Sequence, residues 1–122
     1  MNTLQKIWKI QKSFQHNFFD PDNLTRDEKI KLSKEFILCL HRELGEVLNI
    51  LPWKLHRRVK RVYNTARVKE ELIDCFKFLI NLCMVHGMTP DSFEKLFIEK
   101  SKIVEARYKK EKKHVKALLR SR

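Results

Sequence analysis

Residues that form tight turns are scarce in this chain. Its 122 residues include two glycines and three prolines, whereas sheets joined by short hairpins draw heavily on glycine at positive φ. A chain with so few turn residues is expected to form long helices instead. Its hydrophobic content of 43% is enough for one modest core. We therefore expect a single all-α domain over residues 1–122.

The sequence shows no sign of a membrane span or of a secretory signal. Its longest apolar runs, residues 36–40 and 79–82, fall far short of the roughly 20 residues that cross a bilayer. The three cysteines, Cys39, Cys75 and Cys83, lack CxxC spacing and lie in apolar stretches, which favours buried free thiols over a zinc site or a disulfide. We expect a cytoplasmic protein without a membrane contact.

The net charge of +12 is more than solubility requires of a small domain. From Lys100 to the end there are ten Lys and Arg residues against two acids, and residues 109–122 form a basic tail. Three explanations fit: the phosphates of a nucleotide, a nucleic-acid backbone, or solvated helix faces. A second basic cluster comprises Lys54, Arg57, Arg58, Lys60 and Arg61.

The first half of the chain has the pattern of two helices. Apolar residues at spacings of three and four predict an amphipathic helix over residues 3–19, which ends before Pro21. Thr25 and Glu28 form the T-x-x-E capping box, which predicts a second helix from there to about Asn49. Pro52 prevents its continuation.

The second half predicts two further helices after a basic loop or short helical turn at residues 54–65. Gly87 is a plausible terminator of the first of them. Thr89, Pro90 and Asp91 then give the typical start of a helix at about residue 90, which continues past Tyr108. The apolar side of the earlier helix is marked by Val68, Leu72, Phe76, Leu79, Leu82 and Cys83.

Two pairs of acids have the same spacing on separate predicted helices. Glu43 and Glu46 form one pair, Glu71 and Asp74 form the other, and residues three apart share a helix face. Asn81 lies on the same stripe as Glu71 and Asp74. Carboxylates held so close repel unless a cation lies between them, and a set without organised His or Cys suits Mg²⁺ or Mn²⁺ better than zinc.

The residues after the first acid pair add groups that suit a nucleotide. Lys54 could bind phosphate oxygens and Trp53 offers a face for a base or sugar. Simpler explanations remain open: the acids as solvated helix faces, Trp53 as a core or interface residue, Asn81 as a buried hydrogen-bonding group. The chain has no Gly-rich phosphate loop, and its histidines share no spacing that would suggest a catalytic role.

The order E-x-x-E, W-K, E-x-x-D resembles that of the all-α nucleoside triphosphate pyrophosphohydrolases, the superfamily of the MazG proteins and the dimeric dUTPases. Residues 43–54 are similar to the dUTPase segment in which two metal-binding glutamates precede a Trp-Lys pair. Residues 70–90 are similar to the MazG helix with E-x-x-D, a later Asn and a Gly-x-x-Pro junction. The resemblance covers most of the chain and implies a bundle of four to five helices completed by oligomerisation.

The resemblance also implies roles for individual residues. One of the two glutamates Glu43 and Glu46 would position or deprotonate the attacking water, and the products would be a nucleoside monophosphate and pyrophosphate. The metal ligands for Mg²⁺, with Mn²⁺ possible, would be Glu43, Glu46, Glu71 and Asp74. The substrate would be contacted by Gln11, Trp53, Lys54, Asn81, Lys100 and Arg107.

The chain departs from the dUTPase branch where that branch has asparagines, because it carries Gln15, Ser101 and Val104 there. The leading hypothesis is Mg²⁺-dependent hydrolysis of a nucleoside triphosphate, with dUTP favoured and another base as the alternative. Apolar stripes on helices of so short a chain also predict a homodimer or a dimer of dimers. The competing hypothesis is a non-enzymatic basic helical module that binds nucleic acid through residues 54–61 and 100–122.

Overall fold

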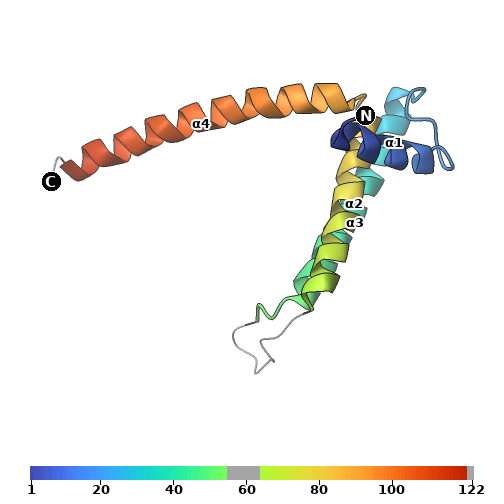
Figure 1. Cartoon of the computed structure of the whole chain (residues 1–122), viewed down its shortest axis with the longest axis horizontal. Coiled ribbons are helices and arrows are strands. Elements are labelled where there is room, and N and C mark those ends of the chain that lie inside the picture. Colours follow the sequence, from blue (N-terminus) through green and yellow to red (C-terminus); the bar gives the residue numbers. More distant parts are fainter. Residues whose placement is uncertain (55–63, 121–122) are drawn as a thin grey trace. The chain divides into compact units, whose positions relative to one another are not determined.

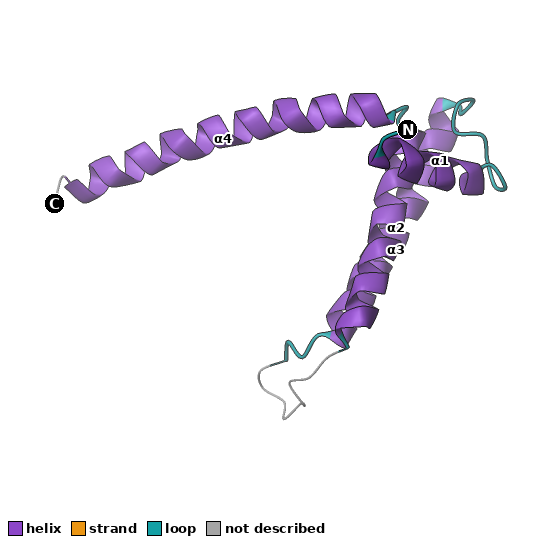
Figure 2. Ribbon diagram, in the orientation of Figure 1, coloured by secondary structure: helices purple, strands orange, loops and turns teal. Residues whose placement is uncertain are grey.

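The computed structural model describes residues 1–54 and 64–120, and these residues form helices joined by turns and loops without any strand (Figure 2). The all-α prediction is confirmed. Arg57, Arg58, Lys60 and Arg61, together with most of the predicted basic loop, lie outside the described residues. The helices are α1 (Thr3–Gln15), α2 (Arg26–Ile50), α3 (Thr65–Val85) and α4 (Pro90–Arg120).

The helices fall into two compact units, Met1–Thr89 and Pro90–Arg122, and each is described here by itself. In the first unit α2 and α3 lie side by side and antiparallel (Figure 1). α1 contacts α3 near the end of the pair at which α3 finishes. The second unit consists of α4. That residues 1–122 act as a single domain stays a prediction.

Helix α1 begins with a capping box that we did not predict from the sequence, and it ends earlier than predicted. The side chains of Asn2 and Gln5 each accept a hydrogen bond from the other's backbone N–H at 2.9 Å, a reciprocal cap. At the other end the Asn17 amide donates to the Phe14 carbonyl at 2.9 Å, and the Phe18 N–H bonds Gln15 instead. The predicted helix over 3–19 is therefore too long, because a side chain competes for the carbonyl that the next helical turn needs.

The predicted cap and end of α2 are confirmed within a residue. Thr25 and Glu28 form both bonds of the capping box, at 3.1 and 3.2 Å, and the bond from Thr25 lowers the pKa of the Glu28 carboxyl. The helix ends at Ile50, and Leu51 already has extended backbone angles, as a residue just before Pro52 should.

Helix α3 ends as the position of Gly87 predicts. Gly87 has φ of 75°, its N–H bonds the Met84 carbonyl at 3.0 Å, and the Met88 N–H bonds Cys83 at 2.9 Å. These two bonds are the Schellman arrangement, which satisfies carbonyls at a helix end. The residue before Gly87, His86, has its Nε2 2.8 Å from the Ser33 hydroxyl oxygen on α2.

One side of α3 carries Glu71, Asp74, Phe78 and Asn81, which we call the polar stripe, and this side faces the neighbouring helices. Much of the apolar side of α3 is exposed. Asp74 and Glu71 are half-buried and Asn81 is buried, whereas Leu72, Phe76 and Leu79 are 40%, 59% and 41% exposed. The inward stripe also contributes an apolar contact: Phe78 on that stripe contacts Phe36 of α2 at a centroid distance of 6.2 Å. The buried apolar residues of this unit are Trp8, Cys75, Met84 and Val85.

Helix α4 continues through the basic tail to Arg120, so the residues beyond Tyr108 are helical. Among the described residues no single helix is long and apolar enough to cross a membrane, although α3 and α4 taken together across their break meet the same test. The predicted free thiols are confirmed for Cys75, which is buried, while Cys39 and Cys83 are free and half-buried.

The two glycines allow a matched test of the fold. Gly87→Ala should lower the free energy of unfolding by about 1 kcal/mol, because alanine is strained at positive φ. Gly45→Ala should raise it by about 0.5 to 1 kcal/mol, because the position is within α2 and a Cβ there meets nothing within 4 Å. Urea unfolding followed by circular dichroism measures both, and equal effects of the two substitutions would contradict this account.

Candidate functional site

Three carboxylates from two helices converge in the first unit. Glu43 of α2 meets Glu71 and Asp74 of α3, and one oxygen of each lies within 4.8 Å of the others. All three residues are half-buried, and the side chain of Glu43 is 13% exposed. The antiparallel packing of α2 on α3 thus joins members of the two acid pairs that are far apart in sequence. We call these three residues the acid cluster.

The acid cluster is electrostatically unfavourable without a positive partner. The pKa of Glu71 is raised above its ordinary value of 4.5, first by burial and then by the charges of Glu43 and Asp74. A hydrogen bond with Glu43 and the charge of Glu46 raise it further. Burial and like charge both disfavour the ionised carboxylate. A proton or a bound cation would therefore stabilise this arrangement.

Glu46 lies close enough to raise the pKa of Glu71, although it is not one of the three carboxylates within 4.8 Å. Glu43 has an additional partner, since Arg42 Nη2 lies 3.2 Å from its Oε1. The Arg42 side chain is 70% exposed, so this ion pair is well solvated and contributes little to stability. Three of the four predicted metal ligands thus lie together, and Glu46 is close enough to Glu71 for their charges to interact.

Cys75 adjoins the acid cluster and was not among the predicted site residues. Burial raises the pKa of its thiol, and the charges of Glu43, Asp74 and Glu71 raise it further. The thiol therefore stays protonated near neutral pH. Its position directly after Asp74 was visible in the sequence, but only the packing of α2 on α3 brings Glu43 near it.

A buried amide pair lies further along the polar stripe of α3. Gln11 Nε2 of α1 donates to Asn81 Oδ1 at 2.8 Å, and the two residues are 6% and 2% exposed. Gln15, one helical turn after Gln11, is also buried. Asn81 follows Asp74 by seven residues, about 10 Å along the helix axis. The structure therefore joins two of the predicted substrate residues to each other and places them on the stripe that carries the acids.

Trp53 and Lys54 follow the end of α2 and contact each other. Lys54 Nζ lies 5.6 Å from the centroid of the Trp53 ring, a cation–π contact, and the Trp53 side chain is half exposed. Trp53 is therefore not a core residue of this unit, which removes one of the simpler explanations for it. Both groups remain accessible to a ligand.

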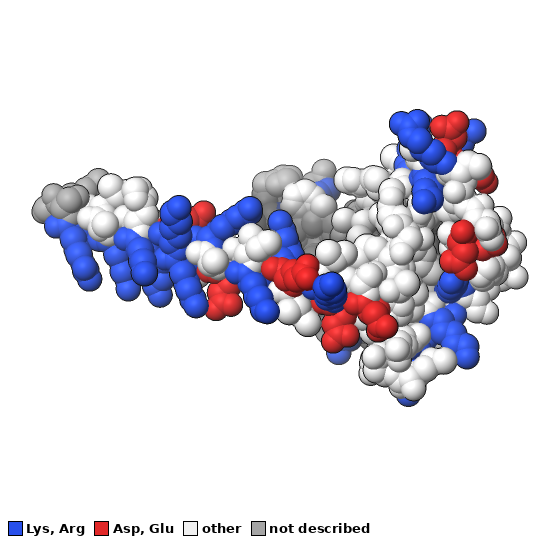
Figure 3. All heavy atoms as spheres, turned by 90° about the horizontal axis from the view of Figure 1, so that it is seen from above, with Lys and Arg blue, Asp and Glu red and all other residues white. Residues whose placement is uncertain are grey.

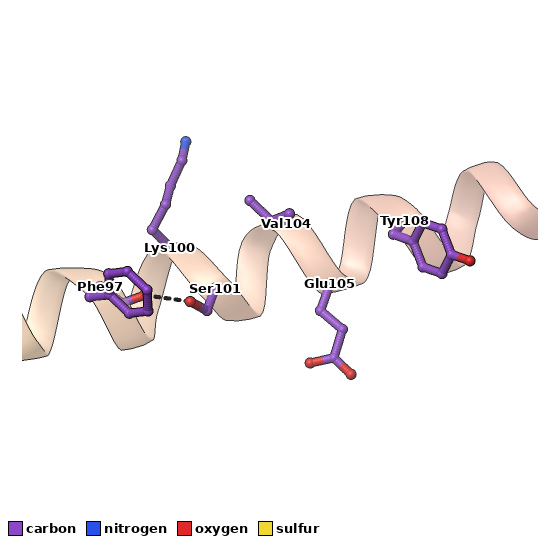
Figure 4. Close-up of a pocket in the computed structure, with 6 residues that line it drawn as sticks. All are labelled: Phe97, Lys100, Ser101, Val104, Glu105 and Tyr108. Carbon is purple, nitrogen blue, oxygen red and sulfur yellow. Dashed lines mark hydrogen bonds between the residues drawn. The ribbon is translucent and has the colours of Figure 1, made fainter. Parts of the chain in front are cut away.

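The predicted phosphate-binding residues Lys100 and Arg107 are exposed on α4. They are seven residues apart and so share one face of that helix. Because α4 forms the separate second unit, the structure does not relate these two residues to the acid cluster. The nearby Ser101 hydroxyl donates to the Phe97 carbonyl at 2.8 Å, within the helix (Figure 4).

In a second group of possible ligands, on the connection after α1, the two acids are already paired. His16, Asp20 and Asp22 are exposed. Asp22 Oδ2 lies 3.0 Å from Lys12 Nζ, and Asp20 accepts a bond of 2.6 Å from the Asn23 amide, which lowers the pKa of Asp20. These two acids stabilise the turn after α1 through their paired groups, whereas the carboxylates of the acid cluster repel one another.

The donor set of the acid cluster fits a small hard cation. Mg²⁺ binds oxygen at about 2.0–2.1 Å in octahedral geometry, so its ligand oxygens lie about 3 to 4.2 Å from one another. Carboxylate oxygens that already lie within 4.8 Å need only small side-chain movements to reach these distances. The cluster contains no sulfur or imidazole ligand, which disfavours zinc.

An all-α fold with half-buried carboxylates shared between two antiparallel helices defines the class: a helical protein with a site suited to a divalent cation. The sequence matches the model of a dUTPase family over residues 3–121, nearly the whole chain, and the chain belongs to that family. The resemblance to the all-α superfamily is thus confirmed, and with it, at a coarse level, an assignment to nucleoside triphosphate hydrolysis. No curated protein sequence and no solved structure matches the chain.

The buried amide pair should contribute to stability as a unit. Gln11→Leu leaves Asn81 Oδ1 buried without its donor and should lower the free energy of unfolding by about 1 to 3 kcal/mol. Adding Asn81→Leu removes the orphaned group and should restore part of that loss. Urea unfolding of the parent, both single variants and the double variant measures the coupling, and strictly additive losses would contradict it.

The raised pKa of Glu71 predicts a pH-dependent stability. Because this pKa lies above 4.5 in the folded protein, folding favours the protonated acid, and its contribution to stability is lost as pH rises from about 4.5 through the folded pKa. In EDTA, Glu71→Gln should therefore be more stable than the parent at pH 7, by a margin that shrinks toward pH 4. Urea unfolding at both pH values measures this.

Glu70→Gln is the matched control, because Glu70 is exposed and precedes Glu71 directly. It should leave the pH profile of stability like that of the parent. A Glu71→Gln variant that is less stable than the parent by the same amount at both pH values would show that the carboxylate is not under electrostatic strain.

Proposed function

We propose that this protein hydrolyses a nucleoside triphosphate, with dUTP favoured, to the monophosphate and pyrophosphate in a Mg²⁺-dependent reaction. The observation that carries the proposal is the acid cluster, in which Glu71 has a raised pKa because other carboxylates crowd it. Such strain is the expected state of a cation site before the cation binds. Membership of a dUTPase family supports the same chemistry.

Glu43, Glu71 and Asp74 would hold the metal, with Glu46 as a further ligand at the edge of the site. Mg²⁺ is proposed, and Mn²⁺ suits the same oxygen ligands. A divalent cation at this position supplies charge neutralisation for the triphosphate and for the oxygens on which negative charge develops. The protein itself holds the carboxylates half-buried, where their interaction with positive charge is stronger than in water.

Glu46 is proposed to position the attacking water and accept its proton. It lies within electrostatic reach of Glu71 but outside the group of three converging carboxylates, so one of its oxygens can remain available to a water molecule. Attack at the α-phosphorus would release pyrophosphate. Catalysis of this kind depends on positioning and on neutralising charge, which four carboxylates can supply.

The nucleotide's phosphates and base require further groups, and the chain offers both. Lys54, Lys100 and Arg107 are exposed cations proposed to contact phosphate oxygens. Trp53 presents a half-exposed ring on which a base or sugar could stack. Gln11, held by Asn81, is proposed to fix the base end of the site, with Asn81 acting through Gln11 because it is almost completely buried.

The preference for dUTP is the part of the proposal with least support from this chain's own residues. Gln15, Ser101 and Val104 replace asparagines of the dUTPase branch, and Ser101 bonds its own helix. Specificity for a base requires hydrogen-bonding groups that an incorrect base leaves unpaired. A comparison of dUTP with dTTP, dCTP and dATP therefore tests the base separately from the chemistry.

A homodimer, or a dimer of dimers, is proposed as the working form. Leu72, Phe76 and Leu79 expose one side of α3 to solvent, and a continuous apolar surface of this kind on a folded helix pair is typical of an interface. A second copy would cover this side and complete the bundle. We also propose a cytoplasmic location, where nucleotide pools are found.

The decisive experiment is a nucleotide panel with purified protein and Mg²⁺, followed by detection of the monophosphate and pyrophosphate. Glu46→Gln and Asp74→Asn should each lower kcat/KM by about 100-fold or more, because each removes a charge from the catalytic site. EDTA should abolish activity. Mn²⁺ should raise the Tm of the parent but not of Asp74→Asn, which reports metal binding without activity.

Glu70→Gln serves as the matched control and should keep the parent's activity within about twofold, because this acid is exposed and outside the cluster. Cleavage of no nucleotide in the panel would overturn the proposed reaction. An unchanged rate in both Glu46→Gln and Asp74→Asn would instead overturn the assignment of the site.

A further inference from the structure

One face of α4 carries a straight row of cations. These residues follow one another at spacings of seven, four, three and four, which places them on a single stripe of the helix. All five are exposed, and Lys and Arg side chains line one side of α4 in Figure 3. We call this row the cationic stripe. It consists of Lys102, Lys109, Lys113, Lys116 and Arg120.

Little negative charge opposes the cationic stripe. Between its ends α4 has two acids, Glu105 and Glu111. Glu105 Oε1 lies 3.3 Å from Lys109 Nζ, and both side chains are about two-thirds exposed, so the pair is weak. Glu111 follows Val104 by seven residues and so lies on another face. The stripe therefore presents an excess of positive charge to its surroundings.

The opposite side of α4 is apolar. Phe97, Val104, Tyr108, Val115 and Leu119 recur at spacings of seven and four and are 63%, 51%, 61%, 52% and 66% exposed. Figure 4 shows the first part of this row, where Phe97, Val104 and Tyr108 line a shallow hollow on the helix. An exposed apolar row of this length is expected to pack on protein in the assembled molecule. The cationic stripe would then face outward.

This arrangement does not suit a helix lying on a membrane. Such a helix buries its apolar side in the bilayer, and the cations that reach lipid headgroups flank that side. At 100° per residue, the cations of the stripe are centred about 130° from the apolar row and would point toward water. A partner that meets the cations alone, without the apolar row, fits the geometry better.

The cationic stripe is also distinct from the residues proposed to contact the substrate. Lys100 and Arg107 share a face, but that face lies about 160° around the helix from Lys102 and Lys109. Nucleotide phosphates bound by the first pair would therefore leave the stripe free. The positive charge of the cationic stripe is therefore not explained by binding of the nucleotide substrate.

We propose that the cationic stripe binds the phosphate backbone of double-stranded nucleic acid without base specificity. From Lys102 to Arg120 the helix extends about 27 Å, the length of about eight base pairs at 3.4 Å each. The stripe contains no aromatic residue on which unpaired bases could stack, which disfavours a single-stranded ligand. The proposal does not depend on the proposed hydrolysis.

The test uses the full chain and a fluorescein-labelled random 20-base-pair duplex, with binding measured by anisotropy between 50 and 200 mM NaCl. The stripe variant combines Lys109→Gln, Lys113→Gln, Lys116→Gln and Arg120→Gln. Removal of four phosphate contacts should make the negative slope of log K against log salt shallower by about 3.6, since each contact contributes about −0.9. Affinity at 100 mM NaCl should fall at least about tenfold, while nucleotide hydrolysis stays at the parent's rate.

The matched control removes the same charge from the first unit, through the exposed residues Lys6, Lys9, Lys31 and Lys34, each replaced by Gln. It should keep most of the parent's affinity and slope. The single variant Lys113→Gln should make the negative slope shallower by about 0.9. Because one such substitution does not unfold a 31-residue helix, this variant tests the stripe even if the quadruple variant misfolds.

Several outcomes would overturn the proposal. These are salt-independent binding by the parent, no binding to duplex at all, or equal losses in the stripe and control variants. Tighter binding to a single strand, to polyglutamate or to vesicles of phosphatidylserine and phosphatidylcholine would also overturn it, by pointing to a different partner.

Discussion

The repulsion among three carboxylates between α2 and α3 is the constraint on which the rest of the first unit depends. Like charges that are half-buried favour separation of the two helices. Packing between the cluster and the end of α3 opposes this tendency: the contact of Phe36 with Phe78, and the contact of Ser33 with His86. The helix pair therefore keeps the three carboxylates close despite their repulsion. A bound cation would remove this repulsion, which favours its binding.

The orientation of α3 links this site to assembly. Because the polar stripe faces α2, Leu72, Phe76 and Leu79 on the other side of α3 stay outside the core of the same unit, and Phe76 is more than half exposed. The buried core is consequently small and lies where α1 meets the later part of α3, around Trp8, Met84 and Val85. The acid cluster and the exposed apolar side both follow from the fact that the polar stripe of α3, and not its apolar side, packs on α2. This exposed apolar side of α3 is the surface that we propose a second copy covers.

Much of the local structure could be predicted from the sequence because local chemistry decides it. The Thr25 and Glu28 cap, the stop at Pro52 and the positive φ of Gly87 depend on residues within one turn of each other, and all three appear as expected. The end of α1 could not be predicted, since it depends on whether the Asn17 amide takes the Phe14 carbonyl from the helix. The acid pairs were recognisable by spacing, but spacing alone allowed both a metal site and two solvated faces.

The sequence by itself determined the all-α class, the cap of α2, the end of α3 and the membership of a dUTPase family, because composition, short-range hydrogen bonding and motif order are properties of the linear chain. Only the tertiary structure decided that Glu43 meets Glu71 and Asp74, that Cys75 adjoins them, and that Gln11 bonds Asn81. These contacts join residues up to 70 positions apart. They depend on which side of α3 faces inward, and periodicity marks the two sides of a helix without saying which one a neighbouring helix will cover.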